Sequence, residues 1–144
     1  MINHHLTSGG YAIAYEHIHG AQPGVIFLSG FRSDMGSTKA AVLAEWAIKN
    51  NVQYTRFDYF AHGKTAGDFK EFTIGTALAD TLEILDHITT GNQILVGSSM
   101  GGWVALLAAL ERKQRVKALV GIAAAPDFTE RMFYKDMSAE QRKE

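Results

Sequence analysis

A strand-like run passes directly into a helix-like run at residues 97–102, which read GSSMGG. Before this stretch stands the short apolar run Ile94–Val96, and such runs are typical of strands that are covered on both faces. After it comes the apolar run Trp103–Leu110, which is long enough for a buried helix. No residues remain for a separate loop, so strand and helix must approach closely, and glycines allow that approach. Any fold that accepts this chain must contain such a turn.

Strand-like and helix-like segments alternate along the rest of the chain. The expected strands are residues 11–18, 25–28, 52–58, 94–96 and 118–123, and the expected helices are residues 39–50, 73–88 and a third that follows the GSSMGG turn and runs through Glu111. This alternation predicts an α/β fold with at least five mostly parallel strands and helices on both faces, in three layers. We expect residues 1–144 to form one domain.

Three local expectations follow from the same patterns. The stretch Gln22–Gly24 contains a proline and a glycine and predicts a turn. Trp46 and Trp103 each lie on an apolar stripe at helical spacing, so we expect both in the core. The residues before Tyr11 are expected to form a loose terminus.

Composition limits the classes of function. The chain has 14 basic and 15 acidic side chains and a formal charge of -1, which leaves no basic surface for nucleic acid or an anionic membrane. It has no cysteine, so disulfides, thiol catalysis and cysteine-bound zinc are excluded. No Lys or Arg precedes Arg32, and no apolar run approaches the ~18 residues of a membrane span. From these absences we expect a cytosol-like compartment.

Ser99 is the central residue of the pattern G-x-S-x-G, which Gly97 and Gly101 complete. Ser98 cannot be central, because its flanking positions are Val96 and Met100. In a sharp strand-to-helix turn, small residues on either side let the elements touch, and the serine takes a strained backbone conformation that exposes its hydroxyl. We therefore predict that Ser99 is a catalytic nucleophile.

A serine nucleophile needs two amides that stabilise the oxyanion. The N–H of Met100 would open the following helix, where the dipole favours negative charge. The loop after the strand at 25–28 is expected to supply the second donor, and Gly30 in this loop would let the backbone pass close to the serine. We expect the N–H of Phe31 to be that donor.

Four stretches carry a resemblance to a known family. In order, they read FLSGFRSDMGSTKA, RFDYFAHG, ILVGSSMGGW and ALVGIAAAPDFTE. The chain resembles the α/β-hydrolase superfamily from about Val25 to Thr129, and within it the serine esterases and thioesterases that include the ABHD-type mitochondrial palmitoyl-protein thioesterase and its bacterial relatives. The resemblance implies that Ser99 attacks an acyl ester or thioester, either a small molecule or an acylated protein. It implies no cofactor and no metal.

The resemblance also implies a triad in the order Ser, Asp, His, yet no histidine follows His87. We therefore expect either a fragment of a longer enzyme or a natural product that lacks most of its triad, with little activity as an isolated chain. His62 is a weak candidate for a substitute base. Asp127 follows the strand at 118–123 and is a candidate acid, although capping of the next helix is the more ordinary role.

A second hypothesis for the function follows if the strand at residues 118–123 is the last strand of the sheet. This apolar strand would be an unpaired edge, and unpaired edges seek partners. The alternative function is therefore a non-catalytic hydrolase-like module that pairs through this strand with itself or with another chain.

The remaining patterns are weaker. Gly63–Thr65 reads GKT, but Asp58 stands where a phosphate-binding loop needs glycine. His17 and His19 share one strand face without a carboxylate at ligand spacing, so surface histidines on an edge strand explain them better than a metal site.

The last residues, 127–144, mix apolar side chains with charges. Phe128, Met132, Phe133 and Met137 are the apolar members. We expect the start of a lid over an acyl pocket, or an amphipathic helix that packs on the core.

Overall fold

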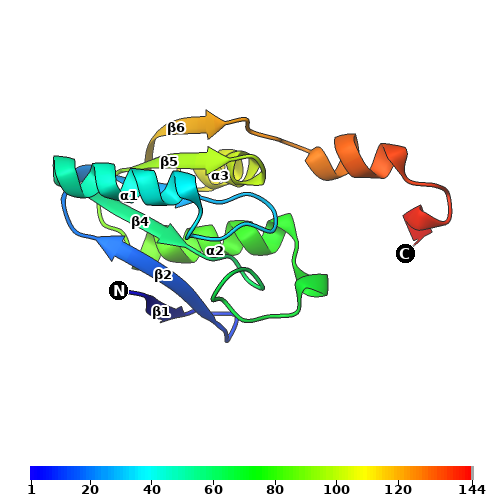
Figure 1. Ribbon diagram of the computed structural model, residues 1–144, viewed down its shortest axis with the longest axis horizontal. Coiled ribbons are helices and arrows are strands. Elements are labelled where there is room, and N and C mark those ends of the chain that lie inside the picture. Colours follow the sequence, from blue (N-terminus) through cyan, green and yellow to red (C-terminus); the bar gives the residue numbers. More distant parts are fainter. Residues whose placement is uncertain (144) are drawn as a thin grey trace.

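The computed structural model describes residues 1–143 and contains a six-stranded sheet in the order β1-β2-β4-β3-β5-β6 (Figure 1). The strands are β1 (Asn3–Leu6), β2 (Ala12–Ile18), β3 (Ala21–Leu28), β4 (Val52–Phe57), β5 (Gln93–Ser98) and β6 (Val116–Ile122). The helices are α1 (Thr38–Asn50), α2 (Ile74–His87) and α3 (Met100–Glu111), with short helical turns at Phe69–Glu71, Thr129–Phe133, Tyr134–Asp136 and Gln141–Lys143. The expected alternation of strands and helices is confirmed.

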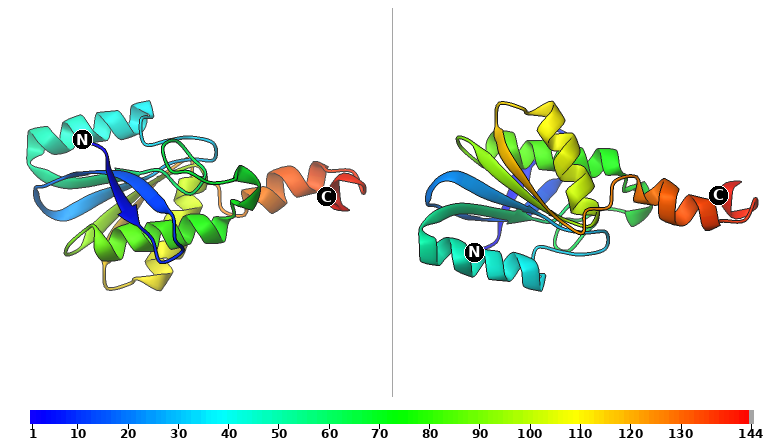
Figure 2. Two further views of the ribbon diagram at one scale, coloured as in Figure 1. Left: turned by 90° about the horizontal axis from the view of Figure 1, so that it is seen from below. Right: turned by 90° about the horizontal axis from the view of Figure 1, so that it is seen from above.

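The sheet has a parallel part and an antiparallel part. β4, β3, β5 and β6 pair in parallel, whereas β2 pairs antiparallel with both β1 and β4. α1 covers one face of the sheet, and α2 and α3 lie side by side on the other (Figure 2). This arrangement confirms the expected three-layer α/β fold.

The central strand β3 serves both faces of the sheet. Val25 and Phe27 are buried in the cluster under α1, and the alternate residues Ile26 and Leu28 are buried in the cluster under α2 and α3. Side chains of a strand alternate between faces, so a strand with two covered faces is apolar without interruption. This is the physical origin of the unbroken apolar run at 25–28.

The expectation for α1 is wrong in one respect. The helix turns Ala40, Ala44 and Ala47 toward the sheet and leaves Trp46 48% exposed. Alanines let the helix axis approach the strands closely, so the larger side chains point sideways. Trp103, by contrast, is half-buried against the core on the other face.

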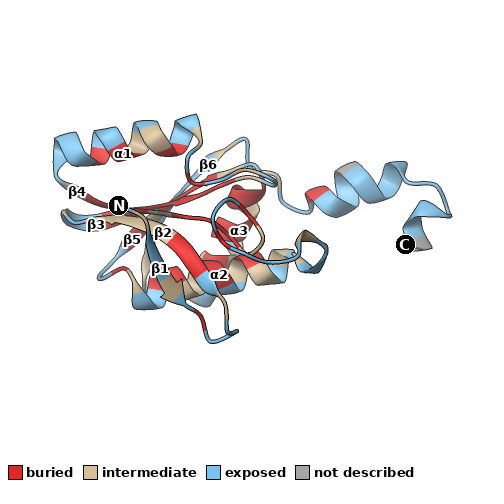
Figure 3. Cartoon of the chain, turned by 60° about the horizontal axis from the view of Figure 1, so that its bottom comes forward, coloured by how far each residue is buried: buried red, intermediate tan, exposed pale blue. Residues whose placement is uncertain are grey.

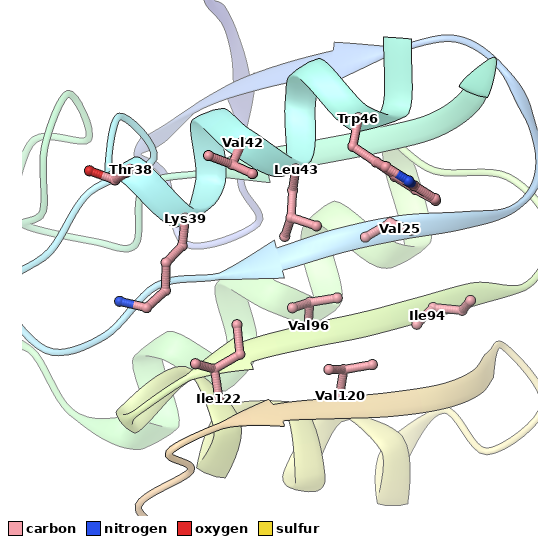
Figure 4. A pocket seen from close by; sticks show the side chains of 10 residues that line it. All are labelled: Val25, Thr38, Lys39, Val42, Leu43, Trp46, Ile94, Val96, Val120 and Ile122. Carbon is pink, nitrogen blue, oxygen red and sulfur yellow. The ribbon is translucent and has the colours of Figure 1, made fainter. Parts of the chain in front are cut away.

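The sideways side chains of α1 line a groove of about 650 Å³ (Figure 4). Its floor is formed by strands β3, β5 and β6, and its wall by α1. The lining residues are Val25, Thr38, Lys39, Val42, Leu43, Trp46, Ile94, Val96, Val120 and Ile122. β6 forms the open edge of the sheet beside this groove.

Two expectations near the N-terminus are corrected. The first residues form strand β1, which a short polar sequence did not predict. Gln22–Gly24 lies inside β3 rather than in a turn, at a register shift between Ala21 and Val25. Proline has no N–H for a ladder, so it is tolerated where the pairing is irregular.

The segment after β6 extends away from the three layers (Figure 1). Phe128 is buried at its start, and the residues beyond it whose burial is described are exposed (Figure 3). The expected helix cap at Asp127 is wrong, because the cap residue of the turn at Thr129–Phe133 is Phe128, without a side-chain cap. The side chain of Met132 lies outside the described part of the chain.

Within residues 1–143, no helix is long and apolar enough to cross a membrane.

The Glu83 carboxylate on α2 binds residues of the N-terminal hairpin formed by β1 and β2. We expect this contact to make the stability of the fold depend on pH. The carboxylate lies 2.9 Å from His5 Nε2 and accepts hydrogen bonds from the hydroxyl (2.7 Å) and the backbone N–H (3.1 Å) of Ser8. These partners lower the pKa of Glu83 from 4.5 to about 2. A carboxylate whose pKa is lower in the folded state stabilises the fold above its unfolded pKa.

We therefore expect the free energy of unfolding to fall as the pH drops from about 4.5 toward about 2. Glu83→Gln should lower stability at neutral pH and remove this part of the pH dependence in urea unfolding curves. Glu45→Gln, at an exposed position of α1, should change neither. An unchanged pH profile in Glu83→Gln would contradict the assignment.

Candidate active site

Ser99 stands alone between the end of β5 and the start of α3, with backbone angles φ 54° and ψ -118°. A serine rarely adopts positive φ, and holding it there costs about 1–3 kcal/mol. Three backbone hydrogen bonds hold it: its N–H donates to Ile122 (3.0 Å), and its carbonyl accepts from Gly102 (2.9 Å) and Ala125 (3.1 Å). The side chain is exposed. The turn therefore presents the hydroxyl to solvent on a constrained backbone.

Glycines make this turn sterically feasible. A Cβ on Gly97 would lie 2.6 Å from the Cα of Gly102, and one on Gly101 would lie 2.7 Å from the carbonyl oxygen of Ser29. Gly102 has the same restriction, because its Cβ would meet Ala124. Helix α3 thus contacts β3, β5 and the segment after β6 where side chains would not fit.

The two amides expected to bind an oxyanion come from the start of α3 and from the loop after β3. Met100 is the first residue of α3, so its N–H belongs to the free donors of a helix N-terminus. The loop after β3 passes beside the strand-to-helix turn at residues 97–101, which we call the elbow, since a Cβ on Gly30 would lie 3.5 Å from Ser99 Cβ. That distance is an ordinary contact, so space alone does not require glycine at 30. Within residues 1–143, no acceptor takes a hydrogen bond from the N–H of Met100 or Phe31.

His62 is buried, and both of its ring nitrogens contact backbone groups. Nε2 lies 3.2 Å from the N–H of Arg32, and Nδ1 lies 2.9 Å from the carbonyl of Phe60. Because neither nitrogen is directed at Ser99, the ring does not act as a substitute base in this arrangement.

Asp127 is exposed, with φ 55°. Its backbone carbonyl accepts from Arg131 N–H at 2.9 Å, and its carboxylate has no hydrogen-bond partner within the described residues. No histidine of residues 1–143 hydrogen-bonds to Ser99 or Asp127, so the described residues do not join Ser99 and Asp127 through a histidine.

Aromatic rings gather beside the elbow, which the sequence patterns did not predict. The ring of Phe31 lies 5.9 Å from Phe128 and 5.4 Å from Phe69, and Phe128 lies 6.0 Å from Trp103. Phe72 joins the same group. The sequence signal that could have predicted this cluster was the presence of two phenylalanines, Phe69 and Phe72, in a polar, glycine-containing loop. The rings form an apolar cluster around Phe31, in the loop that passes beside Ser99.

The other polar clusters of the described chain do not form a metal or phosphate site. Within the described chain, no group of three or more His, Cys, Asp or Glu side chains is placed to hold a metal ion. His17 Nδ1 lies 2.8 Å from the hydroxyl of Thr55, and the ring of His19 packs against it. The GKT stretch offers no free phosphate cradle, because the N–H of Lys64 donates to the Asp58 carboxylate at 2.8 Å.

A family model described as the alpha/beta hydrolase fold matches residues 34–143. The chain belongs to the alpha/beta hydrolase family. The resemblance in the four sequence stretches is thereby confirmed.

Individual alpha/beta hydrolases are similar over most of this chain. The mitochondrial palmitoyl-protein thioesterase ABHD10 of Bos taurus is 44% identical over 115 residues, which are 80% of this chain and 38% of the relative. The structure of alpha/beta hydrolase domain-containing protein 10 from mouse has a TM-score of 0.92 and 38% identity, over 99% of this chain and 57% of that one. A putative hydrolase from Agrobacterium vitis S4 has a TM-score of 0.89 and 37% identity, over 99% and 60%.

The chain spans about two fifths of the length of the curated relatives it matches, 38–44% in each case. These relatives also correct the expected compartment, because each is named as a mitochondrial protein. The cytosolic expectation rested on the absence of a basic leader before Arg32, and such an absence does not define a compartment.

The packing at the elbow predicts different effects for two glycine substitutions at equivalent helix positions. Gly101 and Gly75 are the second residues of α3 and α2. Gly101→Ala should destabilise the fold by about 1–3 kcal/mol or more, because its Cβ would overlap the backbone of Leu28 and Ser29.

Gly75→Ala is the matched control, since its Cβ would lie 3.5 Å from the nearest atom, Thr73 Oγ1. It should be neutral or stabilise by up to about 1 kcal/mol through helix propensity. Urea unfolding of both variants measures the difference. Equal stabilities would show that α3 does not approach β3 as described.

Proposed function

We propose that this alpha/beta hydrolase cleaves acyl esters or thioesters through an acyl-enzyme formed at Ser99. The observation that carries the proposal is the exposed Ser99 side chain on a backbone with φ 54°, at a direct strand-to-helix turn. A structural serine in a connecting turn would not need this strained conformation.

The chemistry assigns one step to each group. Ser99 Oγ attacks the carbonyl carbon of the acyl group, and the carbonyl oxygen becomes an oxyanion that accepts hydrogen bonds from the N–H groups of Phe31 and Met100. Collapse of the tetrahedral intermediate expels the alcohol or thiol and leaves the acyl group on Ser99. Water then attacks this ester, and the carboxylic acid leaves as Ser99 regains its proton.

This cycle also needs a base to take the proton of Ser99 and an acid to orient that base. We infer that both come from sequence of the kind that the relatives contain beyond the matched part. Without them, the two amides and substrate binding leave a residual acceleration of about 10³–10⁴ over water. The 144-residue chain should therefore react slowly.

The aromatic surface beside Ser99 favours an apolar acyl group. Phe31 is 40% exposed in the loop beside Ser99, and the buried ring of Phe128 links it to the half-buried Trp103. Residues 127–143 begin with Phe128 in this surface, and the ring of Phe133 lies 5.8 Å from it, which suits the start of a lid. Together with the names of the relatives, this favours a fatty-acyl thioester, small or protein-bound, as the substrate.

A fluorophosphonate probe tests the nucleophile. Prolonged incubation of the wild-type chain should give a single adduct on Ser99, identified by mass spectrometry of peptides. Ser99→Ala should abolish the adduct, and Ser98→Ala should retain it, because Ser98 ends β5 in ordinary strand pairing. An adduct that survives Ser99→Ala would refute the proposal, and rapid labelling of the wild type would show that the chain contains its own base.

The groove beside α1 favours a second candidate function, a non-catalytic module that pairs with another copy through strand 118–123. β6 forms an open sheet edge, and Leu119 and Val120, which point to opposite faces, are 40% and 48% exposed. The groove adds apolar surface on the same side as α1. Large exposed apolar patches mark interaction sites.

This candidate predicts a concentration-dependent dimer in sedimentation equilibrium. Val42→Glu should weaken the dimer at least about tenfold, because a charge would be buried in the contact. Ile48→Glu is the control: Ile48 is also exposed on α1, at 65%, but does not line the groove. A monomer at every concentration, or equal effects of the two substitutions, would rule the candidate out.

A further inference from the structure

The loop that carries Phe31 is fastened to a second loop that follows β4. We call residues 29–36 the oxyanion loop and residues 58–65 the His62 loop. The Asp58 carboxylate accepts the N–H of Met35 at 2.7 Å and the N–H of Lys64 at 2.8 Å, so one buried side chain joins the two loops. A Cβ on Gly63 would overlap this carboxylate, which shows how closely the His62 loop wraps around it.

His62 makes the second fastening, next to the candidate oxyanion amide. The N–H of Arg32, the residue after Phe31, can only donate, so Nε2 of His62 must accept without a proton. The carbonyl of Phe60 can only accept, so Nδ1 must carry the proton. The two partners therefore require the neutral ring with its proton on Nδ1.

The contact acts on a strained residue. Arg32 has φ 56°, which is costly for a side chain of this size and requires support from its surroundings. The His62 ring is 4% exposed and packs against Phe72 at 4.5 Å and Phe69 at 5.4 Å, so it has little room to move. A fixed acceptor thus holds the peptide that follows the amide of Phe31.

We infer that His62 is a positioning residue: its neutral ring orients the oxyanion loop, and protonation of Nε2 releases Arg32 and disturbs the Phe31 amide. This inference rests on the proposed oxyanion role of Phe31. A protonated Nε2 is a donor facing another donor, so the hydrogen bond cannot persist. The site should therefore weaken in acid through its geometry, apart from any effect on a catalytic base.

The charged groups around the ring come from both loops. Arg32 and Asp34 of the oxyanion loop line a cavity of about 220 Å³ together with His62. The Arg32 guanidinium lies over the rings of Phe31 and Phe69, at 5.6 Å and 5.0 Å. From the His62 loop, Asp58 is buried, which raises the pKa of its carboxyl, while hydrogen bonds from Lys64 and Met35 oppose that rise. Arg32, Asp34 and Asp58 are the charged groups that lie around the ring.

Nuclear magnetic resonance of the ¹⁵N-labelled 144-residue chain tests the inference without any reaction. At neutral pH, a scalar coupling across the hydrogen bond should join Arg32 N to His62 Nε2. It should vanish as the ring is protonated, and the Phe31 and Arg32 amide signals should shift with the same midpoint as the ring nitrogens. The inference would be overturned if the Phe31 and Arg32 amide signals did not change when the ring is protonated, or if Nε2 carried a proton at neutral pH.

Two substitutions separate positioning from packing, with the rate of Ser99 phosphonylation as the readout. His62→Phe keeps a ring but removes the acceptor, and should slow the reaction about 10- to 100-fold, less than the 10²–10³ for loss of a whole oxyanion donor. His62→Gln offers an uncharged oxygen near the position of Nε2 and should retain most of the rate, without the decline that follows protonation of the wild-type ring.

His17→Phe is the matched control, because His17 also hydrogen-bonds through its ring but lies on β2. It should leave the rate unchanged. If His62→Gln is as slow as His62→Phe, the ring rather than the acceptor matters and the inference fails. If Ser99 proves not to be the nucleophile, the proposed function fails, while the coupling between Arg32 and His62 still measures the positioning contact.

Discussion

The contact between the end of β5 and the start of α3 is the constraint on which the remaining site geometry depends. Gly97 lies against Gly101 and Gly102 with no space for a side chain, so the chain must reverse within one residue. That residue is Ser99, and its positive φ is the conformational cost of the reversal. The same contact sets the first turn of α3 against the end of β3. The candidate nucleophile, the helix N-terminus and the loop after β3 are therefore positioned by one packing requirement.

The candidate oxyanion loop has a different kind of support, which is polar and comes from the loop after β4. Asp58 and His62 accept N–H groups at two points of residues 29–36. Hydrogen bonds to buried, well-packed acceptors fix orientation more strictly than apolar contacts do. Under the proposed function, the elbow and this loop would hold the amides of Met100 and Phe31 ready for an oxyanion formed at Ser99. A preorganised environment of this kind is what acyl transfer requires.

The sequence predicted the parts of this structure that depend on local patterns. The alternation of strand-like and helix-like segments identified the α/β fold, and the glycine spacing around Ser99 identified the sharp turn. Both features depend on residues that are close in sequence. The buried face of α1 was misjudged, since two stripes share helical spacing and the alanine stripe, rather than Trp46, meets the sheet. β1 was missed because a short polar strand is defined by its partner β2. The role of His62 depends on contacts with Arg32, thirty positions away, which no local pattern reveals.

The backbone of Ser99 is bound directly to the outermost strand of the sheet. Its N–H donates to Ile122 at the end of β6, and its carbonyl accepts from Ala125 just beyond. Edge strands fray more readily than central ones. The conformation of Ser99 therefore persists only while β6 stays paired with β5. A polypeptide that pairs with β6 would stabilise the elbow through the hydrogen bonds of Ser99 to Ile122 and Ala125. Dissociation of that polypeptide would allow Ser99 to relax toward ordinary backbone angles. Order at the edge of the sheet is thereby transmitted to Ser99, the candidate nucleophile.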